Sequence, residues 1–342
     1  MKEDSARFER SLAILERARA GMRERIVGQE ALVDGILTGF IAGGHVLLEG
    51  VPGLAKTLAV KTFAELSDLS FKRIQFTPDL LPADLIGTLV YEPSKMSFSV
   101  RKGPVFANLV LADEINRAPA KVQSALLEAM AEGQVTIGET SYALPAPFFV
   151  LATQNPIEQE GTYNLPEAEL DRFLLKLLVP YPTLAEEAGI VRKSSGGNLS
   201  GMTTPATQSA RASSAPAISP EDLARVRSDV DAVRLDEALL SYLVSITAAT
   251  RPLAEAKRSP RQRDDYLKYI AFGASPRASI ALASCARIGA LFAGRDYVIP
   301  EDIKAAAYPV LRHRLVLSYE AGADGLSADD IIARVLAVVP LP

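Results

Sequence analysis

The chain has 342 residues, enough for two domains, and its 48% hydrophobic and 23% charged residues predict a packed core and exclude global disorder. The net charge of −4 argues against a protein whose main task is to coat nucleic acid. The first residues are charged and no apolar run approaches the roughly 20 residues of a membrane span, so we expect a cytoplasmic protein without membrane insertion.

The first half of the chain has the pattern of an α/β domain. Helices are predicted over residues 5–25 and up to about residue 41, with Ile26, Val27 and Gly28 between them. Strands are predicted at 45–49, 71–76, 108–112 and 148–153, with helices after residue 57 and at 121–131. Alternation of this kind predicts a parallel sheet with helices on both faces.

Two predicted hairpins interrupt this alternation. The first joins residues 86–91 to 96–101, and the second joins 134–137 to 140–144 with Gly138 in a two-residue turn. Hairpins inserted between sheet and helix are poor core material, so we expect both to contact another molecule.

The second half of the chain begins with a predicted linker, residues 194–219, which is rich in Ser, Thr, Ala, Gly and Pro. Its few apolar side chains cannot offset a backbone entropy of roughly 1–2 kcal/mol per residue, so we expect mobility there. Helices are predicted at 220–232, 236–249, 275–292, 300–308 and 327–339. The sequence therefore predicts an α/β domain over 1–193 and a smaller helical domain over 220–342.

Cysteine and histidine are scarce. Cys285 is the only cysteine and lies in an apolar run, which predicts a buried small hydrophobic residue. His45 and His313 are the only histidines, and neither has a neighbour at metal-ligand spacing, so zinc sites and Ser-His triads find little support.

A glycine-rich segment lies between the predicted strand at 45–49 and the helix that follows. It reads Gly50, Val51, Pro52, Gly53, Leu54, Ala55, Lys56 and Thr57, and is followed by Leu58. This is the phosphate-binding pattern G-x-x-x-x-G-K-[ST], with Ala55 in place of the second glycine, which a right-handed φ would tolerate. Backbone N–H groups would surround phosphate, Lys56 would reach the β- and γ-phosphates, and Thr57 would hold Mg²⁺. The alternative is a glycine-rich turn with a solvated lysine.

An apolar run at 109–112 ends in two adjacent carboxylates, Asp113 and Glu114. The carboxyl ends of buried parallel strands open on the ligand crevice of such a sheet. There Asp113 would hold the water shell of Mg²⁺, and Glu114 would polarise the attacking water. The alternative is a strand that runs into an acidic helix N-terminus.

Three further polar residues fit a nucleotide site. Asn155 follows a predicted strand and could orient the water, although Asn155-Pro156 is also a common strand-ending turn. Arg172 could meet transition-state charge on phosphate, or form an ion pair with Asp171 or Glu169. Arg277 could sense the γ-phosphate from the first turn of a helix, or be an exposed helix-start residue.

Several motifs, in the same order along the chain, together resemble those of the MoxR family of AAA+ ATPases. They lie at 50–57, 109–119, 152–156, 167–173 and 273–278, and the resemblance extends from about Arg25 to the C-terminus. The long Ser- and Ala-rich linker is the part that departs from the family.

The resemblance implies a role for each motif residue. Lys56 and Thr57 would be the Walker A pair, Asp113 and Glu114 the Walker B pair, Asn155 sensor 1, Arg277 sensor 2, and Arg172 an arginine finger that acts on the neighbouring subunit's nucleotide. Ile26, Val27 and Gly28 resemble the stretch that packs on adenine, and Arg117 is a candidate second interface residue. The two hairpins match the helix-2 and pre-sensor-1 insertions, which face the pore of a ring.

The family implies an AAA+ core with a small helical lid, ATP and Mg²⁺ as cofactors, and a hexameric ring that remodels client proteins together with a von Willebrand factor A (VWA) domain partner. Two alternatives stay open. A metal-chelatase motor subunit shares both hairpins, and a nucleic-acid motor could use Lys95, Arg101 and Lys102 on the first hairpin. The acidic net charge, the absence of tryptophan and the lack of a helix-turn-helix or zinc-finger pattern argue against nucleic acid.

Overall fold

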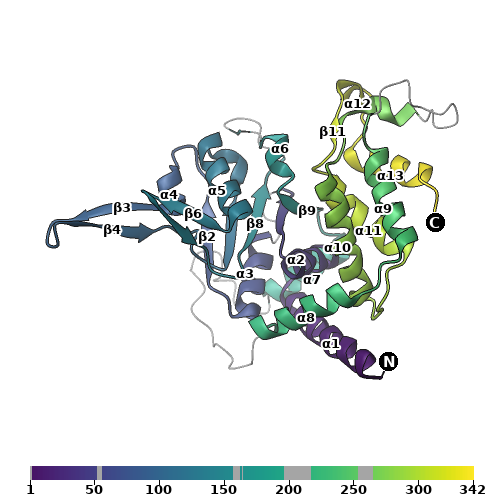
Figure 1. Ribbon diagram of the computed structural model, residues 1–342, viewed down its shortest axis with the longest axis horizontal. Coiled ribbons are helices and arrows are strands. Elements are labelled where there is room, and N and C mark those ends of the chain that lie inside the picture. Colours follow the sequence, from purple (N-terminus) through teal and green to yellow (C-terminus); the bar gives the residue numbers. More distant parts are fainter. Residues whose placement is uncertain (1, 52–55, 157–161, 164, 196–216, 253–264) are drawn as a thin grey trace.

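A five-stranded parallel sheet lies at the centre of the α/β part of the protein (Figure 1). The structure is a computed structural model, and it describes residues 2–51, 56–156, 162–163, 165–195, 217–252 and 265–342. The spatial order is β2-β5-β8-β1-β9, with β1 at His45–Glu49, β2 at Phe71–Gln75, β5 at Leu109–Asp113, β8 at Phe149–Gln154 and β9 at Phe173–Leu178. Four of these strands were predicted. β9 was not, because a leucine-rich apolar run suits a buried helix as well as a strand.

Helices cover both faces of this sheet, as the alternating pattern predicts. Along β1, Leu48 faces a core built with α1 (Lys2–Arg25), α2 (Glu30–Ala42) and α3 (Lys56–Ser67). Its neighbour Leu47 faces the second core, built with α4 (Pro82–Ile86) and α5 (Ala120–Glu132). Successive side chains of a strand point to opposite faces, so a fully buried strand supplies both cores.

Both predicted hairpins are present, and they touch each other. β3 (Gly87–Glu92) and β4 (Ser97–Lys102) project away from the body at the end opposite the helical region (Figure 1). β6 (Gln134–Ile137) and β7 (Thr140–Ala143) form the second hairpin. A Cβ at Gly138 would lie 2.7 Å from Leu89, and the Lys102 ammonium lies 5.8 Å from the Tyr142 ring centre.

The C-terminal region is mainly helical. Its elements are α8 (Pro220–Ala232), α9 (Glu237–Ala249), α10 (Pro276–Phe292), α11 (Pro300–Leu311), α12 (Tyr319–Ala323) and α13 (Ala328–Val338). A short antiparallel pair, β10 (Ile270–Phe272) and β11 (Val316–Leu317), was not predicted. None of the helices within the described ranges combines the length and apolarity needed to cross a bilayer.

The predicted linker falls mostly on residues that lie outside the described ranges. The first two residues of the predicted linker belong to α7 (Leu184–Ser195). In chain order, α7 comes after the short α6 (Glu167–Leu170) and β9. At its end, Ala217 and Ile218 are buried, and the Ala217 N–H donates to Leu66 O at 2.7 Å. The end of the linker is therefore anchored on the α/β part of the chain.

Helix α8 is held against the N-terminal helices by buried polar contacts. Asp229 is fully buried and accepts hydrogen bonds from Ser11 Oγ at 2.6 Å and from Arg7. Arg227 donates to the carbonyls of Phe40 and Ile41 at 2.8 and 2.9 Å, which satisfies the free end of α2. Breaking these contacts would leave buried polar groups without partners, which is energetically costly. The contacts therefore hold the helical region against the α/β part.

The outer edge of the sheet is covered by the segment that follows α11. Because β9 is an edge strand, its outward carbonyls need partners. Arg314 donates to Phe173 O and to Leu174 O, at 2.7 and 3.0 Å, and His313 Nε2 lies 2.9 Å from Phe173 O.

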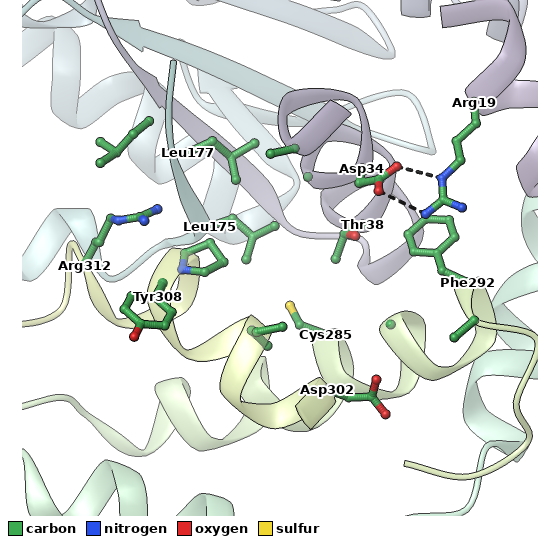
Figure 2. A pocket seen from close by; sticks show the side chains of 18 residues that line it. Arg19, Asp34, Thr38, Leu175, Leu177, Cys285, Phe292, Asp302, Tyr308 and Arg312 are labelled. Atoms are coloured by element: carbon green, nitrogen blue, oxygen red, sulfur yellow. Dashed lines mark hydrogen bonds and ion pairs between the residues drawn. The ribbon is translucent and has the colours of Figure 1, made fainter. Parts of the chain in front are cut away.

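A cavity of about 680 Å³ remains where the two parts meet. Figure 2 shows the Arg19–Asp34 ion pair and the Cys285 thiol among its lining side chains. Arg19 also stacks 4.2 Å over the Phe292 ring. None of the residues predicted to bind nucleotide lines this cavity, so it is distinct from the predicted nucleotide site.

Candidate active site

The carboxyl ends of β1, β5 and β8 meet at one edge of the sheet, and Lys56 lies there. Lys56 is the first residue of α3 and is buried. Its ammonium donates to Gly50 O at 2.5 Å and to Gln154 O at 3.4 Å, so it lies where β1 and β8 end. Gly50 is required here, because a Cβ would lie 2.7 Å from Val179 O. Pro52, Gly53, Leu54 and Ala55 lie outside the described residues.

Asp113 is buried at the end of β5 and is fixed by two neighbouring strands. Thr153 Oγ1, on β8, donates to one carboxylate oxygen at 2.6 Å, and Arg73, on β2, donates to the other at 2.6 Å. The same threonine oxygen accepts the Glu114 N–H at 2.8 Å. Thr153 therefore aligns both carboxylate residues, and neither it nor Arg73 was predicted as part of the site.

Glu114 lies just beyond the strand in a left-handed conformation, with φ of 57°. This conformation costs a non-glycine residue about 1–3 kcal/mol and is common at functional sites. Its carboxylate accepts a hydrogen bond from Gln75 Nε2 at 2.8 Å and pairs with Arg117 at 3.2 Å. Arg117, predicted as an interface residue, thus contacts the predicted base of its own chain.

The remaining predicted nucleotide residues lie near this edge. Asn155 is buried directly after β8, and Thr57 follows Lys56 in the first turn of α3. Gly28 has φ of 71°, and a Cβ there would overlap the Glu186 side chain of α7. The predicted adenine-side segment therefore packs against α7.

Arg172 and Arg277 lie together around Asp171. Asp171 pairs with the buried Arg314 at 2.8 Å and accepts a hydrogen bond from Ser275 Oγ at 2.9 Å. Ser275 caps α10 and accepts the Arg277 N–H at 3.2 Å. Among the described residues Asp171 pairs with Arg314 and not with Arg172, so the alternative of an Asp171–Arg172 ion pair finds no support. Arg277 is an exposed residue in the first turn of its helix.

The arginine pair and the lysine lie at opposite ends of the sheet. β9 pairs in parallel with β1, with Phe173 beside His45 and Leu178 beside Glu49. Arg172 directly precedes β9, whereas the glycine-rich segment follows β1. At roughly 3.3 Å per residue, the six residues of β9 separate the two by roughly 16 Å or more. Both arginines therefore lie beyond the reach of their own Lys56 site.

Burial sets the protonation of the histidines and the cysteine. It lowers the pKa of His45 to about 4, and it lowers the pKa of His313, with further lowering by the neighbouring Arg314 charge. Burial raises the pKa of the Cys285 thiol to about 12. Cys285 is buried, which confirms the prediction of a buried small hydrophobic residue.

A parallel sheet whose carboxyl edge carries a lysine, two carboxylates and an amide, followed by a helical region, defines a P-loop ATPase of the AAA+ class. The model of the "ATPase family associated with various cellular activities (AAA)" matches residues 45–175, and the model of the "AAA lid domain" matches residues 268–335.

Three relatives extend this comparison. The chain is 49% identical to Chaperone MoxR1 of Mycobacterium tuberculosis, over 96% of this chain and 82% of that one. It is 31% identical to Protein MoxR of Methylorubrum extorquens, over 100% of this chain and 96% of that one. A crystal structure of a Cytophaga hutchinsonii protein, provisionally described as an ATPase, superposes with a TM-score of 0.82 at 46% identity and covers 98% of this chain and 97% of that one.

The chain belongs to the MoxR family of AAA+ ATPases. It binds and hydrolyses ATP, and its predicted fold, a parallel-sheet core followed by a lid domain, is confirmed.

Proposed function

We propose that the chain acts in the cytoplasm as a homohexameric ring that couples ATP hydrolysis to the remodelling of protein clients. The separation of Arg172 and Arg277 from Lys56 carries this proposal. An ATPase needs positive charge on the transferred phosphate, and neither arginine reaches its own site. Head-to-tail assembly brings these arginines to the neighbour's nucleotide, so that each site forms only between subunits.

Within one subunit, the carboxyl edge would supply the rest of the chemistry. Lys56 would contact the β- and γ-phosphates, and Glu114 would polarise the attacking water, with Asn155 orienting that water. The left-handed backbone of Glu114 and the Thr153 contact to its N–H support this assignment, because they direct the carboxylate from the strand end. Residues 26–28, against α7, would pack on the adenine.

The donor set at this edge fits Mg²⁺. The ion prefers oxygen ligands and, beside nucleotide phosphates, takes only one or two from the protein. The Thr57 hydroxyl and the buried Asp113 carboxylate are oxygen donors of this kind. When bound, Mg²⁺ would neutralise developing charge on the phosphates.

The hairpins favour a protein client over nucleic acid. Two of the three basic residues that could contact phosphates have partners within the chain: Lys95 pairs with Glu92 at 2.7 Å, and Lys102 lies over the Phe106 ring at 4.7 Å. The exposed side chains of Tyr91, Met96 and Phe98 instead offer apolar surface. The name of the M. tuberculosis relative, a chaperone, agrees with this proposal. We further propose a VWA-domain protein as a partner, on the family resemblance.

Two variants test the assignment of the site. Glu114→Gln should bind ATP yet lose nearly all hydrolysis, because the phosphate and Mg²⁺ contacts remain while the water-polarising carboxylate is gone. Lys56→Ala should weaken binding itself. Equilibrium binding of a fluorescent ATP analogue and steady-state hydrolysis separate the two outcomes. A Glu114→Gln protein that turns over at near wild-type rate, or that no longer binds ATP, contradicts the role of Glu114.

The class of partner is tested by stimulation of the ATPase. Duplex or single-stranded DNA should leave hydrolysis unchanged at physiological salt, where a binder with few phosphate contacts has lost much of its affinity. A candidate VWA-domain protein should raise the rate. Strong stimulation by DNA, with none by protein, would identify a nucleic-acid motor instead.

A further inference from the structure

The face that carries Arg277 continues into an apolar groove on the lid. Arg277, Ile280 and Arg287 recur at helical spacing along α10, so they share one face of that helix. Between α8, α9 and α10 lies a groove of about 340 Å³, lined by Leu240, Val244 and Ile280 among others. Ile280 is 71% exposed and Val244 47% exposed, although both are large apolar residues.

The groove also contains one buried nitrogen without a hydrogen-bond partner among the described residues, and the groove is lined by the Asp231 carboxylate as well as by Arg287. That nitrogen is Arg287 Nε. Buried polar groups are nearly always paired, so this atom indicates that something else completes the groove. A complementary occupant would present apolar side chains to Ile280 and Val244 and a negative charge to Arg287.

Helix α7 has these properties. Its inner side packs on the segment at residues 26–28, with Glu186 against Gly28 and Gly189 near Val27. Its outer side carries Leu184, Glu187 and Val191 at i, i+3 and i+7. Leu184 is 87% exposed and Val191 is 58% exposed. Two large apolar side chains exposed on one side of a helix are surface that a partner could bury.

We propose that α7 of one subunit docks in the α9–α10 groove of its neighbour in the ring, with Leu184 and Val191 against Ile280 and Val244, and with Glu187 facing Arg287. This inference rests on the proposed function and deepens it. α7 flanks the nucleotide segment of its own chain, and the groove adjoins the arginines that would serve the next chain. The same head-to-tail contact would therefore bury both apolar surfaces and complete the active site.

Disulfide trapping tests the contact directly. A Leu184→Cys/Ile280→Cys chain, assembled with ATP and oxidised, should give a ladder of covalent oligomers on a non-reducing gel. A disulfide forms only between Cα atoms closer than about 7 Å. Each single variant is a control that cannot form the ladder, and the wild-type Cys285 is buried. An assembled double variant that stays uncrosslinked overturns the proposal.

Charge exchange gives an independent test. Glu187→Arg and Arg287→Glu should each raise the protein concentration at half-maximal assembly at least about tenfold, because each puts like charges in an apolar contact. The double exchange should restore assembly, which a misfolded variant could not do. Leu341→Glu, at an exposed site near the C-terminus, is the matched control and should assemble normally. Double-exchange chains that assemble no better than either single variant contradict the pairing.

These tests separate this inference from the proposed function. If the wild-type chain assembles and shows activity that depends on assembly, but neither trapping nor charge exchange affects the contact, only the docking of α7 is wrong. If wild-type chains hydrolyse ATP equally well as dilute monomers, the shared active site is wrong, and the docking inference fails with it.

Discussion

Gln75 Nε2 donates a 2.8 Å hydrogen bond to Glu114 Oε2, across the neighbouring strands β2 and β5. Gln75 is the last residue of β2, and the chain continues from it through α4 to the first hairpin. From Glu114 the chain continues through Arg117 and α5 to the second hairpin. The Glu114 carboxylate, proposed as the base, is thus bound by Gln75 and Arg117, and each of these residues lies on the segment of chain that leads to one of the two hairpins.

Gln75→Ala should raise basal turnover about fivefold and leave KM for ATP unchanged. The hydrogen bond from Gln75 holds the Glu114 carboxylate to β2 and stabilises that resting position by about 1 kcal/mol. Glu114 must leave this position to act on water, so removing the bond should lower the barrier by the same amount. Steady-state ATPase kinetics measure this, with Gln134→Ala, an exposed glutamine on the second hairpin, as the control. A loss of turnover like that of Glu114→Gln would show that Gln75 positions the base for catalysis.

Asp171→Ala should lower the free energy of unfolding by about 3 kcal/mol, since it leaves the buried Arg314 guanidinium without its carboxylate partner. Urea denaturation measures the change. Asp296→Ala removes the exposed pair with Arg234 and should cost less than about 1 kcal/mol. Equal effects of the two substitutions would contradict the structural role given to Asp171.

Acidification should destabilise the protein through its buried histidines. His45 accepts the Val150 N–H on Nδ1, and its pKa is about 4 in the folded protein and near 6.5 when unfolded. Between these values the unfolded chain binds a proton that the folded chain does not, so stability is present above pH 6.5 and declines as pH falls. From pH 6.5 to 5 the loss is up to about 2 kcal/mol for His45, and the lowered pKa of His313 acts in the same direction.

Urea titrations at pH 7 and pH 5 check this, with His45→Gln as the comparison, because glutamine can still accept and donate a hydrogen bond. The substitution should reduce the pH dependence of the unfolding free energy. An unchanged dependence in His45→Gln would show that His45 titrates normally in the folded protein.

The sequence predicted where the main residues of the candidate site lie, but it did not predict the side chains that form hydrogen bonds with them. Lys56, Asp113 and Glu114 follow local patterns, in which strand-to-helix order alone places a lysine and two carboxylates at one edge. Arg73, Gln75 and Thr153 reach Asp113 and Glu114 only because β2, β5 and β8 are neighbours in the sheet. No spacing in the sequence encodes that order.

The proposed division of the site between subunits also depends on tertiary structure. The sequence placed Arg277 at a helix start, as observed, but it did not predict that Ser275, the cap of this helix, would bond to Asp171. That contact depends on β9, the strand that the pattern missed, and on Arg314, which joins α11 to its edge. Several helix boundaries, by contrast, followed apolar periodicity: the helix predicted at 220–232 is α8, although its cap, Ser219, was placed in the linker.

Subunit mixing tests the central claim, that each active site is shared by two chains. Arg172→Ala and Lys56→Ala should each be inactive alone. In an equal mixture, roughly a quarter of the interfaces would pair an intact Lys56 with an intact Arg172 from the neighbour, and about that share of wild-type activity should return. Full activity of Arg172→Ala alone, or a mixture no more active than its two components, would contradict the account.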